Sequence, residues 1–217
     1  VGTGKGAEHG VLIKSGAALE TTHKIQTIVF DKTGTITEGN PKVTDIITTN
    51  NLHKDYLLQL AASAEKGSEH PLGEAIVKEA AEKGVEIKKL DYFKAIPGEG
   101  IEVKIDGSDI LLGNRKLMEK SNVEIKSMEE SSHELAKQGK TPMYISVDGN
   151  IAGIIAVADT VKENSKKAID KLHKMGIEVA MITGDNRRTA EAIAKQVGID
   201  RVLAEVLPQD KANEVKK

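Results

Sequence analysis

The sequence has 217 residues, of which 39% are hydrophobic, 29% are charged and only 2% are aromatic. This balance predicts one large packed domain or two small ones rather than a disordered chain. The formal net charge of −2 and the scarcity of aromatic side chains argue against a nucleic-acid binder, and the absence of cysteine excludes disulfides and thiolate metal sites.

No apolar run approaches the roughly 18 to 20 residues that a membrane-spanning helix needs, and no signal peptide is visible. The chain starts without a methionine and ends in a charged run at Lys217. We therefore expect a soluble fragment of a longer polypeptide, in a reducing setting such as the cytosol.

The two ends of the chain predict a parallel sheet. A short apolar strand at 27–30 stops at Asp31, and strands alternate with helices toward the other end of the chain. This alternation is typical of a doubly wound parallel sheet. We expect a helix at 161–174, a strand at 179–182, a helix at 187–197 and a strand at 201–204.

The middle of the chain predicts an antiparallel sheet with helices on it, because its apolar residues recur first with a helical and then with an alternating period. We expect helices at 55–66 and 72–83, and strands at 101–105, 110–112, 143–147 and 151–157. The simplest architecture is an α/β domain formed by residues 1–43 and 154–217, interrupted by an α+β domain at 44–153.

The string Asp31-Lys32-Thr33-Gly34-Thr35 directly follows the first apolar strand. Ligands of doubly wound sheets bind at the carboxyl ends of strands, so Asp31 is a candidate nucleophile; the plainer alternative is an Asp that caps a turn. The string resembles the phosphorylation signature of the P-type ATPases, within the haloacid dehalogenase superfamily. The resemblance implies that Asp31 accepts the γ-phosphate of ATP and that the backbone carbonyl of Thr33 helps it hold Mg²⁺.

Residue 33 bears on the kind of activity. Phosphatases of this superfamily usually carry a second Asp two residues after the nucleophile, where this chain has Thr33. A hydroxyl is a poor general base for water, so an aspartyl phosphate should persist. This favours a pump, with a soluble phosphatase of the same superfamily as the alternative.

Two further motifs predict phosphate contacts near Asp31. Thr183-Gly184-Asp185-Asn186 precedes a helix, whose N-terminal end favours phosphate, although its polar side chains would also serve as a plain helix cap. Leu207-Pro208-Gln209-Asp210-Lys211 starts another helix, on which a lysine is usually only solvated. The resemblance implies that the Thr183 hydroxyl contacts the phosphoryl group, that Asp185 supports the metal and the loop, and that Lys211 places a point charge at the phosphate.

The central segment carries a nucleotide-domain pattern. Ser68-Glu69-His70-Pro71-Leu72, with Glu65 before it, resembles the signature of the heavy-metal-transporting branch, where the His orients ATP and the Glu contacts the adenine side; a surface histidine at a helix start is the plainer alternative. Gly98-Glu99-Gly100 resembles the branch's Gly-x-Gly loop, where missing side chains let the nucleotide approach, and Gly113-Asn114 matches a further nucleotide-side pair. These matches imply that residues 44–153 bind ATP.

The segment Asp159-Thr160-Val161-Lys162 resembles the hinge that rejoins the two domains in this family, and it would also cap the helix expected from 161. We assign it no catalytic role.

The opening segment from Gly4 to Lys14 looks most like the copper (Cu⁺ or Ag⁺) exporters of this branch, while zinc, cadmium and lead exporters share most of the motifs. The resemblance implies a part of a copper-exporting P-type ATPase at the cytoplasmic face of a membrane. Its partners would be the actuator and transmembrane domains of the same polypeptide, and the transported metal would bind outside this chain.

The family carries a further Asp ligand for Mg²⁺ beyond the position of Lys217, so we expect a C-terminally incomplete phosphorylation domain. We expect ATP binding with weak or no autophosphorylation by this chain alone. A module that only binds nucleotide is the corresponding alternative.

Overall fold

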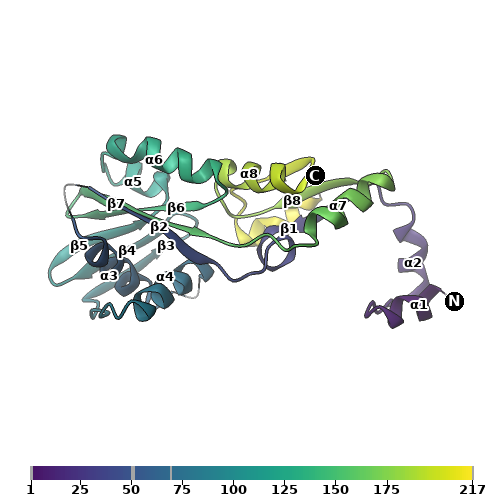
Figure 1. Cartoon of the computed structure of the whole chain (residues 1–217), viewed down its shortest axis with the longest axis horizontal. Helices are drawn as coiled ribbons and strands as arrows, with labels where there is room; N and C mark the ends of the chain where they lie inside the picture. The colour runs from purple at the N-terminus through teal and green to yellow at the C-terminus, as the bar shows by residue number, and fades with distance from the viewer. Residues whose placement is uncertain (1, 50–51, 69, 217) are drawn as a thin grey trace.

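The computed structural model describes residues 2–49, 52–68 and 70–216, which form two sheets (Figure 1). One sheet has three parallel strands in the order β1-β8-β9, and the other has six antiparallel strands in the order β2-β7-β6-β5-β4-β3. With their helices we call them the parallel-sheet unit and the antiparallel-sheet unit. The two units follow one another along the long axis of the molecule.

The parallel-sheet unit draws its strands from both ends of the chain. They are β1 (Thr27–Asp31), β8 (Glu178–Ile182) and β9 (Arg201–Leu203), and the helices are α7 (Ser165–Lys174) and α8 (Arg187–Val197). Ile169 of α7 and Ile193 of α8 share one apolar cluster with Met181 of β8. The apolar run of β8 does not alternate with polar residues, because β8 is buried on both faces. The prediction of a parallel sheet whose strands come from both ends of the chain is confirmed.

The helix predicted at 161–174 begins later, at Ser165. Val161 instead forms an antiparallel bridge with Thr37, and the amide of Lys162 donates a 3.0 Å hydrogen bond to the carbonyl of Ile36. The prediction was wrong for residues 161–164 because a tertiary contact outweighs the local helix preference there.

The antiparallel-sheet unit is a sheet covered by helices on both faces (Figure 1). Its strands are β2 (Lys42–Thr48), β3 (Tyr92–Ile96), β4 (Gly100–Ile105), β5 (Ser108–Gly113), β6 (Thr141–Val147) and β7 (Asn150–Ala158). Its helices are α3 (Lys54–Glu65) and α4 (Pro71–Glu82) on one face, and α5 (Arg115–Lys120) and α6 (Lys126–Lys137) on the other. In β7, Ile155 and Val157 join the cluster with α3 and α4, whereas Ile154 and Ala156 join the cluster with α5 and α6.

Two Asp-Gly turns close the hairpins of this sheet. Asp106 and Gly107 have φ values of 50° and 82°, and Asp148 and Gly149 have φ values of 48° and 78°. Two consecutive left-handed residues match the right-handed twist of paired strands, and Asp-Gly tolerates them. The predicted hairpins β4–β5 and β6–β7 are therefore confirmed.

The chain crosses between the units twice, and the two connecting segments contact one another. β2 and β7 pair with one another, so the boundaries expected near residues 43 and 154 fall inside these strands. The Asp159 carboxylate, just after β7, accepts hydrogen bonds from the Thr37 hydroxyl at 2.5 Å and from the amides of Gly39 and Asn40 at 3.1 and 3.2 Å. The returning chain thus holds the outgoing chain in place.

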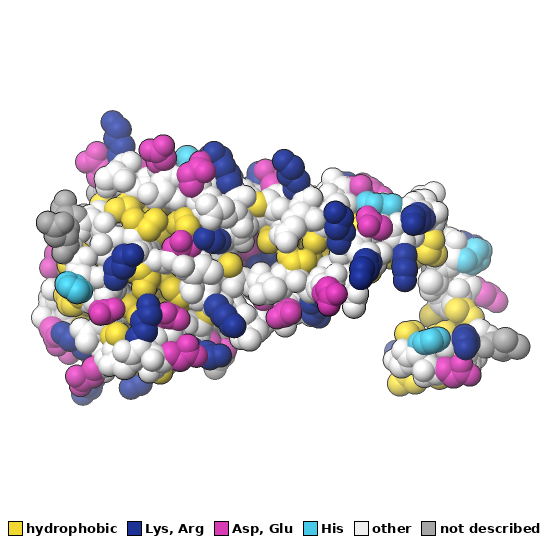
Figure 2. All heavy atoms as spheres, in the orientation of Figure 1, with side chains coloured by type: hydrophobic (Ala, Val, Ile, Leu, Met, Phe, Trp, Pro, Cys, Tyr) yellow, Lys and Arg dark blue, Asp and Glu magenta, His cyan; other side chains and the backbone are white. Residues whose placement is uncertain are grey.

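The N-terminal residues form an arm. Helices α1 (Gly2–Glu8) and α2 (Gly16–Thr22) bury no side chain and project from the parallel-sheet unit (Figure 1 and Figure 2). At the other end, Pro208 starts the turn η2 (Pro208–Asp210), which leads into α9 (Lys211–Val215), as predicted. No helix among the described residues is long and apolar enough to cross a membrane.

We expect Asp159→Ala to lower the free energy of unfolding by about 1 to 3 kcal/mol, because the buried Thr37 hydroxyl and two amides lose this acceptor. Urea unfolding followed by circular dichroism measures the change. The control Asp91→Ala removes an exposed carboxylate before β3 and should cost less than about 0.5 kcal/mol. Equal losses in the two variants would show that the connecting segments do not depend on Asp159.

Candidate active site

Asp31 is the last residue of β1 and lies at the carboxyl end of the parallel sheet. The register with β8 places it opposite Ile182, directly before Thr183. Nζ of Lys211 lies 2.8 Å from Oδ1 of Asp31, and the Asp31 side chain is 46% exposed. The carboxylate is therefore open to a ligand from solvent and has a cation beside it.

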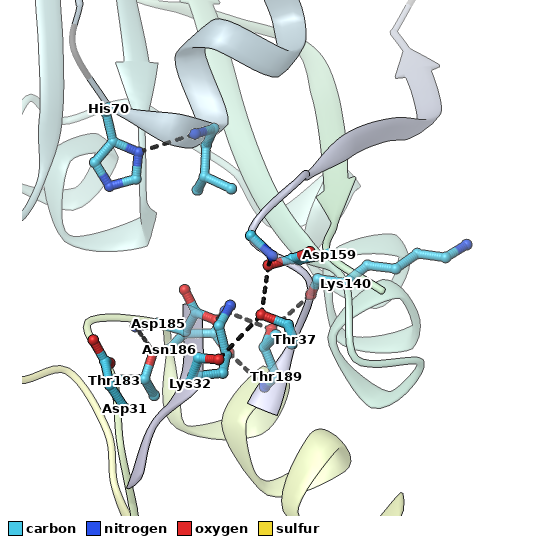
Figure 3. A network of polar contacts seen from close by, with 12 residues as sticks. Asp31, Lys32, Thr37, His70, Lys140, Asp159, Thr183, Asp185, Asn186 and Thr189 are labelled. Carbon is cyan, nitrogen blue, oxygen red and sulfur yellow. Dashed lines mark hydrogen bonds and ion pairs between the residues drawn. The ribbon is translucent and has the colours of Figure 1, made fainter. Parts of the chain in front are cut away.

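A second ion pair lies next to the first. Nζ of Lys32 is 2.5 Å from Oδ2 of Asp185, and the two side chains are only 8% and 13% exposed. Removing either charge would leave the other buried and unpaired, which is costly, so each side chain fixes the other. The amide of Asp185 also donates a 3.1 Å hydrogen bond to the Thr183 hydroxyl. Figure 3 shows Asp31, Lys32, Thr183 and Asp185 in one group.

Thr33 lies in η1 (Lys32–Ile36), a wide turn that carries the chain out of β1. Within it Gly34 has a φ of 75°, a left-handed conformation that suits glycine. The Lys162 ammonium donates a 2.6 Å hydrogen bond to the Gly34 carbonyl, which fastens the turn to the returning chain. Thr33 itself is exposed, close in sequence to the Asp31 carboxylate.

The donors at this edge fit Mg²⁺ only as a partial set. Among the described residues, no group of three or more His, Cys, Asp or Glu side chains is arranged for a metal ion. Mg²⁺ typically uses one or two protein carboxylates and completes its shell with waters and substrate phosphates. Asp31 and the backbone carbonyl of Thr33 would supply two such donors, while the Asp185 carboxylate is already paired with Lys32.

His70 belongs to the antiparallel-sheet unit but lies across from these charges (Figure 3). Its Nδ1 accepts a 3.2 Å hydrogen bond from the amide of Leu72 and so caps α4. Desolvation lowers the pKa of His70 from its ordinary 6.5, Asp185 opposes this shift and Lys32 adds to it. The imidazole is thus neutral at pH 7, and because Nδ1 is the acceptor, Nε2 carries the proton and can donate to a ligand.

Glu65 ends α3 and is 5% exposed. Within the described chain its Oε2 has no hydrogen-bond partner. Desolvation raises the pKa of this carboxyl, although a hydrogen bond with Ser68 opposes the shift. Gly73 makes room for it, because a Cβ there would lie 2.3 Å from Oε2. A buried carboxyl group with an unpaired oxygen and a perturbed pKa is a candidate for ligand contact.

Gly100 and Gly113, which are predicted to lie beside a nucleotide, are packed closely against protein backbone. A Cβ on Gly100 would lie 2.2 Å from the carbonyl oxygen of Leu112, and a Cβ on Gly113 would lie 2.2 Å from that of Glu99. The two glycines are also register partners in β4 and β5. The close approach of these strands is one physical reason that both positions are glycine.

Gly98 lies where the two units meet, and Asn114 holds it in place. Asn114 donates a 2.8 Å hydrogen bond from Nδ2 to the Gly98 carbonyl, while its Oδ1 caps α5. A Cβ on Gly98 would lie 2.6 Å from Cδ2 of Leu207, in the loop that leads to Lys211. The turn before β4 thus lies against the loop that carries the lysine of the Asp31 ion pair.

The structure gathers the predicted residues around two places. One is the edge of the parallel sheet, with Asp31, Thr33, Thr183 and Lys211. The other is the antiparallel-sheet unit, with Glu65, His70, Gly98, Gly100, Gly113 and Asn114. Sequence reasoning assigned no role to Lys32; its signal was a lysine directly after the apolar run of β1, at a position where a buried charge needs a partner.

Comparison with known proteins defines the class. The model of the family described as haloacid dehalogenase-like hydrolase matches residues 25–217. The chain therefore belongs to the haloacid dehalogenase-like hydrolases.

Relatives narrow this class to P-type ATPases. The chain is 52% identical over 214 residues to a copper-exporting P-type ATPase of Bacillus subtilis (strain 168), and 54% identical over 218 residues to one of Staphylococcus aureus (strain JH9). These matches cover 99% and 100% of this chain but 27% of each relative, so the chain spans about a quarter of their length. The resemblance to the P-type ATPases is confirmed.

Solved structures agree with this assignment. A zinc-transporting PIB-type ATPase in the E2.Pi state is 36% identical, with a TM-score of 0.67, and the match covers 99% of this chain and 34% of that one. The catalytic domain of the CPx-ATPase CopB-B is 27% identical, with a TM-score of 0.71 and coverage of 99% and 74%. The chain is similar to the catalytic part of these enzymes.

We expect Glu65→Gln to gain stability relative to the wild type as the pH rises. Because the folded-state pKa of Glu65 lies above its ordinary 4.5, the stability linked to the protonated carboxyl is present below pH 4.5 and is lost as the pH rises through the raised pKa. Glutamine cannot ionise and escapes that loss. Free energies of unfolding measured from pH 4.5 into the neutral range test this.

The matched control is Glu130→Gln, which changes an exposed carboxylate on α6 and should show no such trend. If the difference between Glu65→Gln and the wild type were independent of pH, or grew in the opposite direction, Glu65 would not have a raised pKa in the folded protein.

Proposed function

We propose that this chain is the ATP-binding and phosphorylation part of a metal-translocating P-type ATPase, and that Asp31 takes the γ-phosphate of ATP. The observation that carries the proposal is the exposed Asp31 carboxylate with the Lys211 ammonium 2.8 Å from it, at the carboxyl end of a parallel sheet. An anion that must attack an anionic phosphoryl group needs a cation at that place.

The proposed reaction is a single displacement at phosphorus. An oxygen of Asp31 forms a bond to the γ-phosphorus of ATP, the bond from that phosphorus to the bridging oxygen breaks, and ADP leaves with the electron pair. Lys211 neutralises charge on the transferred group. The buried Thr183 hydroxyl donates a hydrogen bond to a phosphoryl oxygen, and the Lys32–Asp185 pair keeps the loop that carries Thr183 in place.

Mg²⁺ bound with ATP would be held by Asp31 and the backbone carbonyl of Thr33, with Asp185 supporting the loop, and would neutralise phosphate charge and align the γ-phosphate. The residue two positions after the nucleophile, Thr33, supplies no carboxylate base for water. The aspartyl phosphate therefore survives long enough to drive a conformational step. This argues against the phosphatase alternative.

The antiparallel-sheet unit is the proposed nucleotide-binding domain. Glu65 offers a buried carboxyl oxygen that has no hydrogen-bond partner among the described residues, and His70 offers an Nε2–H donor across from Asp185. Gly98 and Asn114 line the side next to the Lys211 loop. Gly100 and Gly113 contribute by keeping the backbone there close-packed, which lets the same surface approach a nucleotide.

The transported ion is the finer part of the proposal. The relatives that share 52% and 54% of residues are named copper-exporting, whereas the zinc-transporting structure shares 36%. We therefore favour export of Cu⁺ or Ag⁺ over that of zinc, cadmium or lead. The transported metal binds outside this chain, and the partners are ATP and the actuator and transmembrane domains of one polypeptide at the cytoplasmic face of a membrane.

Phosphate transfer tests the proposal in a full-length polypeptide that contains this sequence. ATP labelled at the γ-phosphate should produce an acid-stable, hydroxylamine-labile label that is absent from Asp31→Asn. Lys211→Met should slow labelling by about 100-fold, because it removes one preorganised charge at the phosphoryl group. Quenched-flow labelling measures both effects.

The control Lys195→Met changes an exposed lysine of α8 and should label at the wild-type rate. A label that persists in Asp31→Asn, or that resists hydroxylamine, would refute Asp31 as the acceptor. ATP binding without any label in the wild type would leave only the nucleotide-binding alternative.

A further inference from the structure

Among the described residues, the two units touch on two sides of the molecule. On one side, Thr189 and Ile193 of α8 meet the turn between α6 and β6. On the other side, Lys116 of α5 pairs with Glu205, and Leu207 lies against Gly98. The two contacts differ in burial. We expect the more buried contact to stay intact when the units move relative to one another.

The first contact is buried and directional. Thr189 is 1% exposed, and its hydroxyl donates a 2.6 Å hydrogen bond to the carbonyl of Lys140 in the neighbouring unit. The same oxygen accepts a 2.8 Å hydrogen bond from Nδ2 of Asn186, whose Oδ1 caps α8 through the amide of Thr189 at 3.0 Å. Thr189 is thus satisfied only when α8 and the α6–β6 turn are correctly placed (Figure 3).

Apolar packing reinforces this hydrogen bond. Ile193, one helical turn after Thr189, is 6% exposed and presses its Cδ1 against Gly139, where a Cβ would lie only 2.9 Å away. Gly139 has a φ of 77°, a conformation that few other residues adopt. The turn is therefore shaped to receive α8.

The contact reaches further into both units. The side chain of Lys140 forms a 2.7 Å ion pair with Asp45 of β2. On the other side, Asn186 directly follows Asp185, which holds Lys32 next to Asp31. A continuous path of bonds thus runs from the loop beside the nucleophile to the sheet of the antiparallel-sheet unit.

The second contact is weaker. The Lys116–Glu205 pair spans 3.4 Å, and its side chains are 58% and 45% exposed. Exposed ion pairs add little stability and exchange readily with water. A nucleotide can therefore separate this contact at little cost, whereas separation of the buried contact would strand a hydroxyl and a carbonyl.

We propose that Thr189 is a positioning residue: with Lys140, Ile193 and Gly139 it forms a fixed pivot that aligns the proposed nucleotide-binding unit with the phosphoryl-transfer loop. The inference about alignment stands on the contact itself, and its effect on phosphate transfer rests on the proposed function. Opening of the units would then occur on the side of Lys116 and Glu205.

The alignment can be measured without any assay of function. The chain has no cysteine, so Lys89→Cys and Lys171→Cys place spin labels on exposed positions of the two units without background. Thr189→Val, which keeps the shape but loses the hydroxyl, should broaden the interdomain distance distribution from pulsed electron paramagnetic resonance. Thr189→Ser, which keeps the hydroxyl, should restore the narrow distribution.

A matched control separates this role from a general loss of stability. Thr49 also donates from a hydroxyl to backbone carbonyls, at 3.0 and 3.1 Å, but within the antiparallel-sheet unit. Thr49→Val should leave the distance distribution unchanged. An unchanged distribution in Thr189→Val, or equal broadening in the two valine variants, would overturn the pivot.

Loss of the pivot should slow phosphate transfer while leaving the affinity for ATP nearly unchanged. In the full-length polypeptide, Thr189→Val should bind ATP with a Kd within about twofold of wild type but transfer phosphate about tenfold more slowly, the loss expected for one buried hydrogen bond. Thr189→Ser should recover the rate. If Thr189→Val lost ATP affinity by the same factor as its rate of phosphate transfer, the positioning role would be refuted. If the wild type transferred no phosphate, the proposed function would be contradicted, but the distance measurement would still test the pivot.

Discussion

The parallel pairing of β1 with β8 is the constraint on which the site depends. Its register sets Asp31 opposite Ile182, so that Asp31 and the Thr183 loop leave the sheet at one edge. Two ion pairs then differ in burial: Lys32–Asp185 is nearly sealed from water, whereas Lys211–Asp31 is exposed. The buried pair is costly to break and serves as scaffold, and the exposed pair can exchange partners with an incoming anion. The proposed phosphoryl transfer therefore uses the exposed carboxylate of Asp31, and the buried pair stays intact.

The antiparallel-sheet unit contributes the proposed contacts to the nucleotide. Helices cover both faces of its sheet, and two polar residues of the predicted nucleotide pattern lie at helix ends, Glu65 at the end of α3 and His70 at the start of α4. In the part of the chain that the structure describes, one buried oxygen of Glu65 has no hydrogen-bond partner, and His70 is held neutral with one nitrogen engaged in capping α4. The buried contact through Thr189 and the exposed contact through Lys116 give the two units one firm and one loose connection. Such an arrangement favours rotation about one side of the interface.

Local signals made much of this predictable, and long-range contacts made the rest unpredictable. Some features depend only on residues that are adjacent in the sequence. They are the apolar runs of β1 and β8, the Asp-Gly hairpins and the motifs around Asp31 and Thr183. By contrast, β3 is an edge strand exposed along most of its length, so it carries no alternating pattern, and β2, α5 and α6 were not predicted individually. The pairing of Lys32 with Asp185 joins residues 153 positions apart, and the backbone contacts of Gly100 and Gly113 appear only once the strands are in register.

The central claim is that the Asp31 carboxylate is the acceptor of a phosphoryl group. Beryllium fluoride with Mg²⁺ tests it directly, because this fluoride complex binds a carboxylate oxygen with the tetrahedral shape of a phosphoryl group. Fluorine NMR of a full-length polypeptide containing this sequence should show a protein-bound resonance that disappears in Asp31→Asn. A bound resonance of equal intensity in Asp31→Asn, or none in the wild type, would contradict the assignment.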